Sequence, residues 1–390
     1  MTGSAKTALF AWELGEGLGH LPTLKAIAEG LQREGCTIVF ALRDPAPARA
    51  SLASLGGVIL QAPYWPDPVA VSKPSYTYAD ILAANGFGSA AQLSSLLDAW
   101  DDIFDAAKPD LVVCEHSPTA VVAAFGRIPV AIVGNGFIVP PADTASFPTH
   151  GTASGEAISQ SDVLAVMRDA LGRKGRVAPE TITEPFRSAF RGVYSFPELD
   201  PYRAIRRDVV FGPVEAMPPL TPLPSHRKLF FYSASDYALI DELVAALMEI
   251  GPQASVFLRG SPGAKAAILK SRGVSFFSAA PRLDEALPQA TCAFSHAGSG
   301  FASAALAAGR PQVLNPRHGE AALTANALEG LGVGISLPLL ERKRLREAIE
   351  RVHTDPAFAE NAQRVGAAAQ EFIARANAME RTIGALRSLS

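Results

Sequence analysis

Residues 291–334 read TCAFSHAGSGFASAALAAGRPQVLNPRHGEAALTANALEGLGVG, and this stretch decides the fold. The short apolar runs at 292–295 and 312–315 have the composition of buried strands. The alanine-rich segment between them is typical of a helix, which Gly309 and the proline after it would end. Another helix pattern closes the stretch. This order predicts parallel strands joined by helices, with a ligand at the carboxyl ends of the strands and a phosphate on the helix start.

A second unit of the same kind stands near the N-terminus. Residues 8–13 and 37–42 are strand patterns, and the helix pattern between them follows the turn Gly15-Glu16-Gly17-Leu18-Gly19-His20. Strand, helix and strand at this spacing predict another parallel sheet. The turn also approaches the dinucleotide fingerprint GxGxxG, but His20 takes the place of its third glycine. The turn therefore fits the fingerprint of an NAD-binding dehydrogenase only in part, and this interpretation is not favoured.

Length and composition are typical of a globular protein with two domains: the chain has 390 residues, of which 48% are apolar. Its net charge of −3 comes without a basic stripe, which argues against a nucleic-acid binder. Cys36, Cys114 and Cys292 lie in or beside predicted strands and should be reduced. No run reaches the ~20 apolar residues that cross a bilayer, and the start lacks the pattern of a signal peptide. We expect a cytoplasmic protein.

Both units carry motifs that resemble the donor-binding and catalytic signatures of UDP-glycosyltransferase-type enzymes. The family pattern runs HGGxGT, a helix ending AAGxPxVxxP, an acid–Gln pair, NA and LGxG, and residues 296–334 follow it in register. Ala297, Phe301 and Ala321 depart from it, where the family has Gly, Thr and Gln. The resemblance, closest to the bacterial small-molecule and macrolide branch, implies the GT-B fold. That fold has two doubly wound α/β domains, each with a parallel, Rossmann-like sheet, facing across a cleft.

The resemblance also implies the domain limits. Residues 1–212 would form an acceptor-binding N-terminal domain, which the sequence FPELD at 196–200 helps to place, and residues 213–228 a proline-rich linker. Residues 229–372 would bind the nucleotide sugar. Residues 373–390 would form a helix that crosses back to the first domain.

By the same resemblance, His20 is the general base and Glu115 takes the place of the Asp that orients it. An imidazole of near-neutral pKa can accept a proton from an acceptor hydroxyl. The alternatives are a helix-start histidine bonded to a carbonyl and an ordinary strand-end carboxylate. His116 is interpreted as a satisfied surface histidine. Attack assisted by His20 implies inversion at the anomeric carbon, because Leu328 stands where retaining enzymes of this fold have their second glutamate.

The expected donor site collects residues at the carboxyl ends of the strands. The N–H groups of 298–300 and the helix dipole would meet the diphosphate, and a buried carboxylate would accept hydrogen bonds from sugar hydroxyls. The donor-binding residues are Ser235, Pro281, His296, Gly298, Ser299, Gly300 and Glu320. His296 has the alternative of closing its turn structurally. Since the chain lacks an Asp-x-Asp motif, we expect no metal and no cofactor beyond a UDP- or dTDP-sugar as co-substrate.

Aromatic residues between 63 and 100 suit either an acceptor pocket or a cover over the first core. We expect Trp65, Phe87 and Phe137 to contact a small-molecule or lipid acceptor. The sequence thus predicts an inverting, metal-independent glycosyltransferase. A sugar-nucleotide epimerase of the same fold and a non-catalytic sugar-nucleotide-binding protein are the alternatives. The oligomeric state stays open and includes a homodimer.

Overall fold

The structure is a computed structural model that describes residues 5–15, 18–67, 77–150 and 157–389. The chain divides into two compact units. Unit 1 comprises Met1–Glu215 together with Asn377–Ser390, and unit 2 comprises Ala216–Ala376. Glu16 and Gly17, which belong to the predicted first turn, lie outside the described residues. The expected cleft between two domains stays a prediction.

A parallel sheet of six strands forms the centre of unit 1, in the order β3-β2-β1-β4-β5-β6. Its strands are β1 (Thr7–Trp12), β2 (Thr37–Leu42), β3 (Val58–Gln61), β4 (Leu111–Glu115), β5 (Val130–Gly134) and β6 (Phe190–Val193). The strand order reverses between β1 and β4. In a doubly wound sheet, ligands bind at this switch point, outside the carboxyl ends of the strands.

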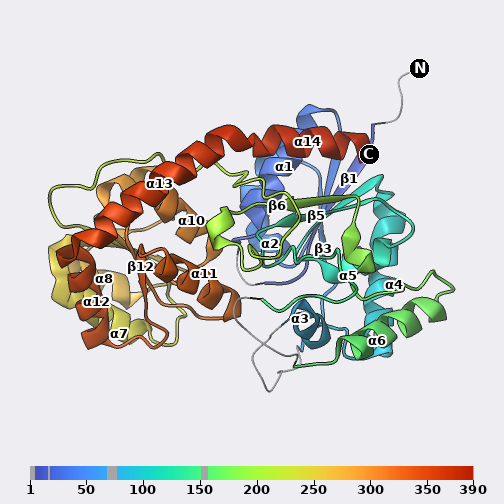
Figure 1. Ribbon diagram of the computed structural model, residues 1–390, viewed down its shortest axis with the longest axis horizontal. Coiled ribbons are helices and arrows are strands. Elements are labelled where there is room, and N and C mark those ends of the chain that lie inside the picture. The colour runs from blue at the N-terminus through green and yellow to red at the C-terminus, as the bar shows by residue number, and fades with distance from the viewer. Residues whose placement is uncertain (1–4, 16–17, 68–76, 151–156, 390) are drawn as a thin grey trace. The chain divides into compact units, whose positions relative to one another are not determined.

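Helices cover both faces of this sheet, and β1 shows why. Successive side chains of a strand point to opposite faces, so Phe10 and Trp12 pack on the side of α1 and α14, whereas Leu9 and Ala11 pack toward α3 to α6. Helices α1 and α14 lie side by side (Figure 1). The helices of unit 1 are α1 (Leu21–Arg33), α2 (Pro45–Ser51), α3 (Tyr78–Ala84), α4 (Ala90–Ala107), α5 (Pro118–Ala124), α6 (Gln160–Arg173) and α14 (Ala378–Leu389).

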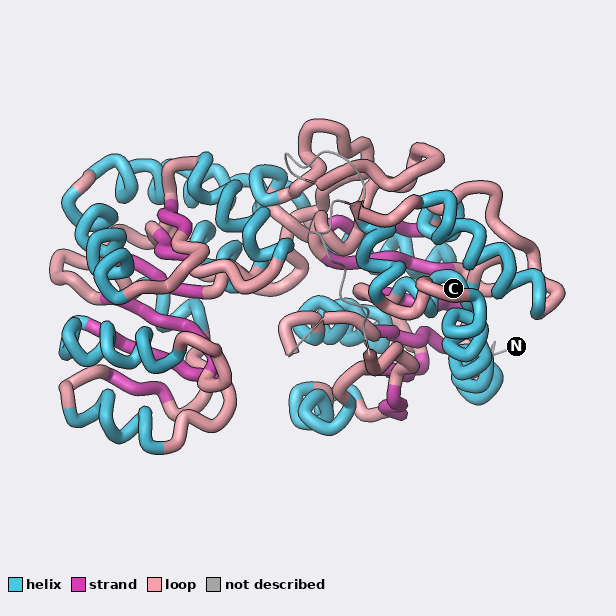
Figure 2. The backbone as a smooth tube through the Cα atoms, turned by 90° about the horizontal axis from the view of Figure 1, so that it is seen from below, coloured by secondary structure: helices cyan, strands magenta, loops and turns pink. Residues whose placement is uncertain are grey.

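Unit 2 repeats the architecture, with a parallel sheet in the order β12-β11-β10-β7-β8-β9. Its switch point lies between β7 and β10, and Figure 2 shows the strands with helices on both sides. The strands are β7 (Leu229–Ala234), β8 (Ala254–Arg259), β9 (Ser275–Phe277), β10 (Cys292–Ser295), β11 (Gln312–Leu314) and β12 (Gly334–Ser336). The helices are α7 (Ile240–Ile250), α8 (Ala264–Ser271), α9 (Leu283–Ala286), α10 (Ser299–Ala307), α11 (Gly319–Gly330), α12 (Arg342–Thr354) and α13 (Pro356–Ala376). Nowhere in the described ranges is a helix long and apolar enough to cross a membrane.

The predicted α/β class with two doubly wound parallel sheets is confirmed. Strands β2 and β10 have the predicted bounds, while β3, β6 and β12 were not predicted. These three are edge strands of three or four residues. An edge strand is less enclosed than a central one, so its sequence need not read as a continuous apolar run.

The proline-rich stretch belongs to unit 2 from Ala216 onward. The fully buried Arg310 donates to the carbonyl of Thr221 at 2.9 Å and to that of Pro222 at 3.3 Å. Gln370 of α13 donates to the carbonyl of Pro218 at 2.7 Å. Side-chain donors thus satisfy backbone carbonyls of a segment that has no regular secondary structure of its own.

The sequence FPELD contains the acid of a buried ion pair in unit 1. Asp200 is 0% exposed and Arg206 is 2% exposed, with Arg206 Nη2 3.0 Å from Asp200 Oδ1. The same guanidinium donates to the carbonyls of Gly136 at 2.8 Å and Val139 at 2.9 Å. A Cβ on Gly136 would lie 2.2 Å from Asp200 Oδ1, so only glycine fits there. This pair therefore fixes the loop after β5, which carries Phe137.

Replacing Asp200 by Ala should lower the stability of unit 1 strongly, because it removes the fully buried one of the two carboxylates, Asp200 and Asp208, that face the buried guanidinium. Losing one partner of a buried pair costs about 3 kcal/mol or more. The midpoint of thermal unfolding measures this. Asp169→Ala is the matched control, since Asp169 pairs with Arg173 on the surface, and its midpoint should equal that of the wild type. Equal midpoints for both variants would contradict the structural role of the buried pair.

Candidate active site

His20 and Glu115 meet at the switch point of unit 1. His20 immediately precedes α1, and Glu115 is the last residue of β4. The imidazole Nδ1 lies 2.9 Å from Oε1 and 2.7 Å from Oε2 of the carboxylate. Since the carboxylate accepts, Nδ1 carries the proton, and Nε2 is the nitrogen with the accepting lone pair. The structure thus brings together the two residues that the sequence analysis paired.

The imidazole ring of His20 is held on two sides. Trp12, the last residue of β1, stacks on it with ring centroids 5.3 Å apart and an interplanar angle of 27°. Gly15 has φ +94°, and a Cβ at that position would lie 2.2 Å from His20 Nε2. The glycine of the predicted turn is therefore needed both for its backbone conformation and for the space beside Nε2. The His20 side chain is 17% exposed, so it stays within reach of a ligand.

His116 corrects one expectation, because it is buried rather than on the surface. It adopts φ +47°, and neither ring nitrogen has a hydrogen-bond partner among the described residues. Its ring centroid lies 5.9 Å from that of His20. Burial, and then the charges of His20 and Arg43, lower the His116 pKa to about 3. The imidazole beside the dyad is thus neutral.

A buried carboxyl lies directly after β1. Glu13 is 1% exposed; it accepts the hydroxyl of Thr119, and the N–H of Ala120 at 2.9 Å. The indole of Trp100 donates to the Thr119 hydroxyl at 2.8 Å. This network ties the end of β1 to the start of α5 and to α4, and so fixes the strand end from which the turn with His20 departs. Burial raises the Glu13 pKa to about 8 against the lowering effect of these hydrogen bonds.

At the switch point of unit 2, His296 follows β10 and is held by two neighbours. Its Nδ1 lies 3.2 Å from the carbonyl oxygen of Asn315, and its Nε2 lies 2.7 Å from the hydroxyl of Ser233. A carbonyl only accepts, so Nδ1 donates to it and Nε2 accepts from Ser233. Burial, with smaller effects of Arg317 and Arg259, lowers the His296 pKa to about 4. The ring is therefore neutral and closes its turn, which is the structural alternative weighed from the sequence.

The predicted diphosphate-binding turn lies open to solvent. Gly298 is the N-cap of α10, and a Cβ on Gly298 or Gly300 would meet no atom within 4 Å. Ser299, between them, is half-buried. Ala297 has φ +57° and is fully buried, so a departure from the family glycine falls on a left-handed position. Helix α10 thus begins with two exposed glycines, and the N–H groups of a helix start are donors of the kind that bind an anion.

The other predicted donor residues lie at the same edge of the sheet. Ser235 follows β7, and its N–H donates to the carbonyl of Arg259 at 2.8 Å. Pro281 comes between β9 and α9 and is half-buried. Glu320 stands in the first turn of α11, whose N-cap is His318 with Nδ1 accepting the N–H of Ala321 at 3.4 Å. His318 therefore has a structural role in beginning this helix.

The three predicted acceptor contacts differ in exposure. Trp65 and Phe137 are half-buried, and the Phe137 ring lies 5.4 Å from that of His150. Phe87 is 1% exposed and belongs to the core between the sheet and α3 to α6. A ring without accessible surface packs the core and offers nothing to a ligand. Phe87 as an acceptor contact is therefore wrong, and it belongs to the cover that was the alternative interpretation.

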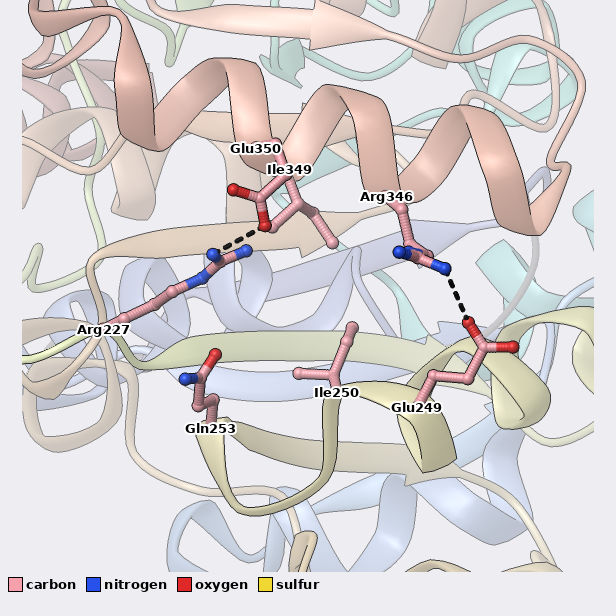
Figure 3. A pocket seen from close by; sticks show the side chains of 7 residues that line it. All are labelled: Arg227, Glu249, Ile250, Gln253, Arg346, Ile349 and Glu350. Carbon is pink, nitrogen blue, oxygen red and sulfur yellow. Dashed lines mark ion pairs between the residues drawn. The ribbon is translucent and has the colours of Figure 1, made fainter.

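A cavity of about 510 Å³ in unit 2 lies away from these residues (Figure 3). It is close to Arg227, just before β7, and hence near the amino ends of the strands. The charges that line it are paired: Arg227 Nη1 is 2.7 Å from Glu350 Oε1, and Arg346 Nη1 is 3.5 Å from Glu249 Oε2. Its lining comprises Arg227, Glu249, Ile250, Gln253, Arg346, Ile349 and Glu350. Paired charges at the opposite edge of the sheet give it no part in the candidate site.

Comparison with known proteins agrees with this architecture. Residues 274–380 match the family model of the erythromycin biosynthesis protein CIII-like, C-terminal domain. The calicheamicin glycosyltransferase CalG4 has a TM-score of 0.68 to this structure, with 99% of this chain and 98% of that one covered at 19% identity. The resemblance to the UDP-glycosyltransferase type is confirmed, and the fold is GT-B.

Other GT-B structures in the comparison contain nucleotides. The Streptomyces sp. SF2575 glycosyltransferase SsfS6, complexed with thymidine diphosphate, has a TM-score of 0.60 at 18% identity and covers 94% of this chain and 96% of its own. LpCGTa in complex with UDP has a TM-score of 0.62 at 17% identity, and the match covers 99% of each chain.

A sterol 3-beta-glucosyltransferase of Komagataella phaffii is 41% identical over 71 residues. This match spans 18% of the present GT-B chain and 6% of that much longer relative.

Several residues of the site were not predicted from the sequence. Ser233, Tyr237 and Asn315 surround His296, and Glu13 and His116 lie beside the dyad. All of them except Tyr237 end a strand or come within one residue of a strand end at the two switch points. Their position at the ends of predicted strands is the feature of the sequence that could have identified them as site residues. No local pattern shows which partner each side chain takes.

Glu13→Gln should flatten the dependence of stability on pH. In the unfolded chain the Glu13 carboxyl has its ordinary pKa of 4.5, whereas in the folded protein its pKa is about 8. The free energy of unfolding therefore falls as the pH rises from 4.5 to 8. At about 1.36 kcal/mol for each pKa unit, the full effect of this group on the free energy of unfolding is about 5 kcal/mol. Glutamine is neutral in both states and can accept the N–H of Ala120.

The measurement is the midpoint of thermal unfolding from pH 5 to pH 8. The wild-type midpoint should fall relative to that of Glu13→Gln as the pH rises. Glu29→Gln, on the surface of α1, is the matched control and should follow the wild type. Parallel curves for wild type and Glu13→Gln would show that Glu13 ionises normally.

Proposed function

We propose that the protein is a glycosyltransferase that moves a sugar from a UDP- or dTDP-sugar to a hydroxyl of a small-molecule or lipid acceptor. The observation that carries this proposal is the contact of His20 Nδ1 with the Glu115 carboxylate at the switch point of unit 1. The GT-B fold and the match of residues 274–380 support it.

In the proposed reaction, His20 acts as general base. Nε2 accepts the proton of the acceptor hydroxyl as that oxygen attacks the anomeric carbon. The bond from this carbon to the diphosphate oxygen breaks, and its electron pair leaves with the diphosphate. Glu115 holds the tautomer that leaves Nε2 ready to accept, and its charge stabilises the imidazolium that forms. Attack on the face opposite the leaving group inverts the anomeric configuration.

The donor is proposed to bind unit 2. The open first turn of α10, with Gly298, Ser299 and Gly300, supplies N–H groups and the positive end of a helix dipole to the diphosphate. Glu320, in the first turn of α11, is proposed to accept hydrogen bonds from sugar hydroxyls. With these groups facing the diphosphate, the proposed reaction uses no metal ion and no cofactor.

The acceptor is proposed to be amphipathic. Trp65 and Phe137 expose part of their rings, and aromatic rings suit a ligand that is largely apolar with a hydroxyl at one end. A sterol, named in the description of one similar protein, is a ligand of this kind.

Calorimetric titration with UDP, dTDP, GDP and NAD tests the donor proposal. Binding of UDP or dTDP, with neither GDP nor NAD bound, is expected from the match to nucleotide-containing GT-B structures. The configuration of the product, read by NMR from the anomeric proton, tests inversion. Binding of NAD alone would overturn the proposal, and conversion of the sugar nucleotide without an acceptor would indicate an epimerase.

Substitutions in the dyad should lower turnover without weakening donor binding. His20→Ala removes the base, and loss of general-base catalysis typically lowers kcat by about 10² to 10⁴. Glu115→Gln should lower kcat less, because a neutral amide no longer stabilises the imidazolium. Glu115→Asp restores the charge and should recover part of the rate. The measurements are kcat with a sterol or phenol acceptor and the affinity for UDP or dTDP.

The same assay separates catalysis from mere binding. Because His20 and Glu115 both lie in unit 1, the affinity of each of the three variants for the nucleotide should equal that of the wild type. If His20→Ala turns over as fast as the wild type, His20 is not the base. If the wild type binds the nucleotide but no sugar is transferred to any acceptor tried, a non-catalytic binding protein becomes the better account.

A further inference from the structure

The first turn of α10 supplies the proposed donor site with only the partial positive charge of a helix dipole, about half an elementary charge. A departing nucleoside diphosphate carries two to three negative charges, about as many as a bound metal ion would offset. His296, directly after β10, is one candidate for the cation. However, its Nδ1 already donates to the carbonyl of Asn315 and its Nε2 accepts from Ser233. A neutral imidazole with both nitrogens engaged adds no cation. The charge must come from other side chains at this edge of the sheet.

Arg317 is the first such side chain. It comes three residues after β11, is exposed, and its guanidinium lies 5.0 Å from the ring centroid of Tyr237. The Tyr237 ring is in turn 4.6 Å from His296, and its hydroxyl donates to the side chain of Asn315 at 2.5 Å. A buried, hydrogen-bonded tyrosine thus holds the cation beside the turn from which α10 starts.

Arg259 is the second. It is the last residue of β8, next to β7 in the sheet, and its carbonyl accepts the N–H of Ser235. Its side chain is exposed. Gly260 follows with φ +93°, and a Cβ there would lie 2.6 Å from Ser235 Oγ. The charges of Arg259 and Arg317 both act on His296, which places both guanidinium groups near the same imidazole.

Neither arginine has an acidic partner within the described parts of the chain. Other exposed arginines of unit 2 do: Arg282 pairs with Asp284, and Arg342 pairs with Glu242. Arg259 and Arg317 thus offer two guanidinium groups that no ion pair among the described residues occupies, near one turn at the carboxyl ends of the strands. An anionic ligand would complete this arrangement, and a guanidinium matches phosphate oxygens with two parallel N–H donors.

We propose that Arg259 and Arg317 bind the diphosphate of the nucleotide sugar and stabilise the charge that it gains as the glycosidic bond breaks. This inference rests on the proposed function and assigns it two further residues. The anomeric carbon–oxygen bond breaks toward the diphosphate, whose oxygen takes the electron pair. The two guanidinium groups meet that charge, while the proton of the acceptor goes to His20.

Calorimetry on the full chain tests the proposal with UDP, dTDP and uridine as probes. Arg317→Gln and Arg259→Gln should each weaken binding of the preferred diphosphate by about ten- to a hundredfold, as expected for a lost charged hydrogen bond. Binding of uridine, which has no phosphate, should not change. Each variant should also make binding less sensitive to salt, because one cation fewer faces the phosphates.

Two control variants accompany the test. Arg272→Gln removes an exposed arginine of unit 2 at the end of α8, before β9 and hence at the opposite edge of the sheet. It should bind the diphosphate like the wild type. Arg317→Lys keeps the charge without the planar fork and should recover part of the affinity. Equal midpoints of thermal unfolding show that all variants are folded.

The outcomes distinguish this inference from the proposed function. If the wild type binds neither UDP nor dTDP, the donor proposal itself fails. If the wild type binds one of them and both glutamine variants bind it with the same affinity and the same salt dependence, the arginines have no part in the site, and this inference is overturned while the function stands. A loss confined to the diphosphate, with uridine binding retained, supports it.

Discussion

The parallel pairing of β1 with β4 is the constraint on which the candidate active site depends. The pairing sets Ala11 beside Cys114, so the two strands end together. The chain leaves β1 toward one face of the sheet through α1 and leaves β4 toward the other through α5. The two connections separate at this point, and the space between them is where His20 and Glu115 meet. Strand order, rather than any local motif, therefore makes a dyad from residues 95 positions apart.

Unit 2 uses the same constraint for a different chemistry. The pairing of β7 with β10 brings Ser233 to His296, and the neighbouring β11 brings Asn315 to the other side of the ring. In unit 1 the switch-point histidine donates from Nδ1 to a carboxylate. In unit 2 its counterpart faces a hydroxyl and a carbonyl and stays neutral. The same place in the fold holds a histidine–carboxylate pair in one unit and a histidine that closes a turn in the other, because the adjacent strand ends carry different residues.

Much of this fold could be predicted from the sequence, because buried central strands such as β2 and β10 read as short apolar runs between turn residues. The pairing of His20 with Glu115 could also be predicted, since both positions match motifs of a known family. Edge strands were missed because their burial is incomplete. Phe87 and His116 were expected to be accessible but are buried. Aromatic and imidazole side chains occur both on protein surfaces and in cores, so the residue type alone does not decide. The partners of His296 depend on strand neighbours far apart in sequence, which no local pattern encodes.

The return of the chain to unit 1 has a consequence for how the protein is made. Helix α14 contributes Leu386 and Ala378 to the core under β1, and Thr382 hydrogen-bonds the buried Tyr194 at 2.7 Å. Unit 2 lies wholly between the two parts of unit 1 in the sequence. During synthesis, every residue of unit 2 therefore leaves the ribosome before unit 1 has its last helix. Unit 2 can therefore finish folding before unit 1, whose sheet has α1 but not yet α14 on that face until residues 378–389 have been made.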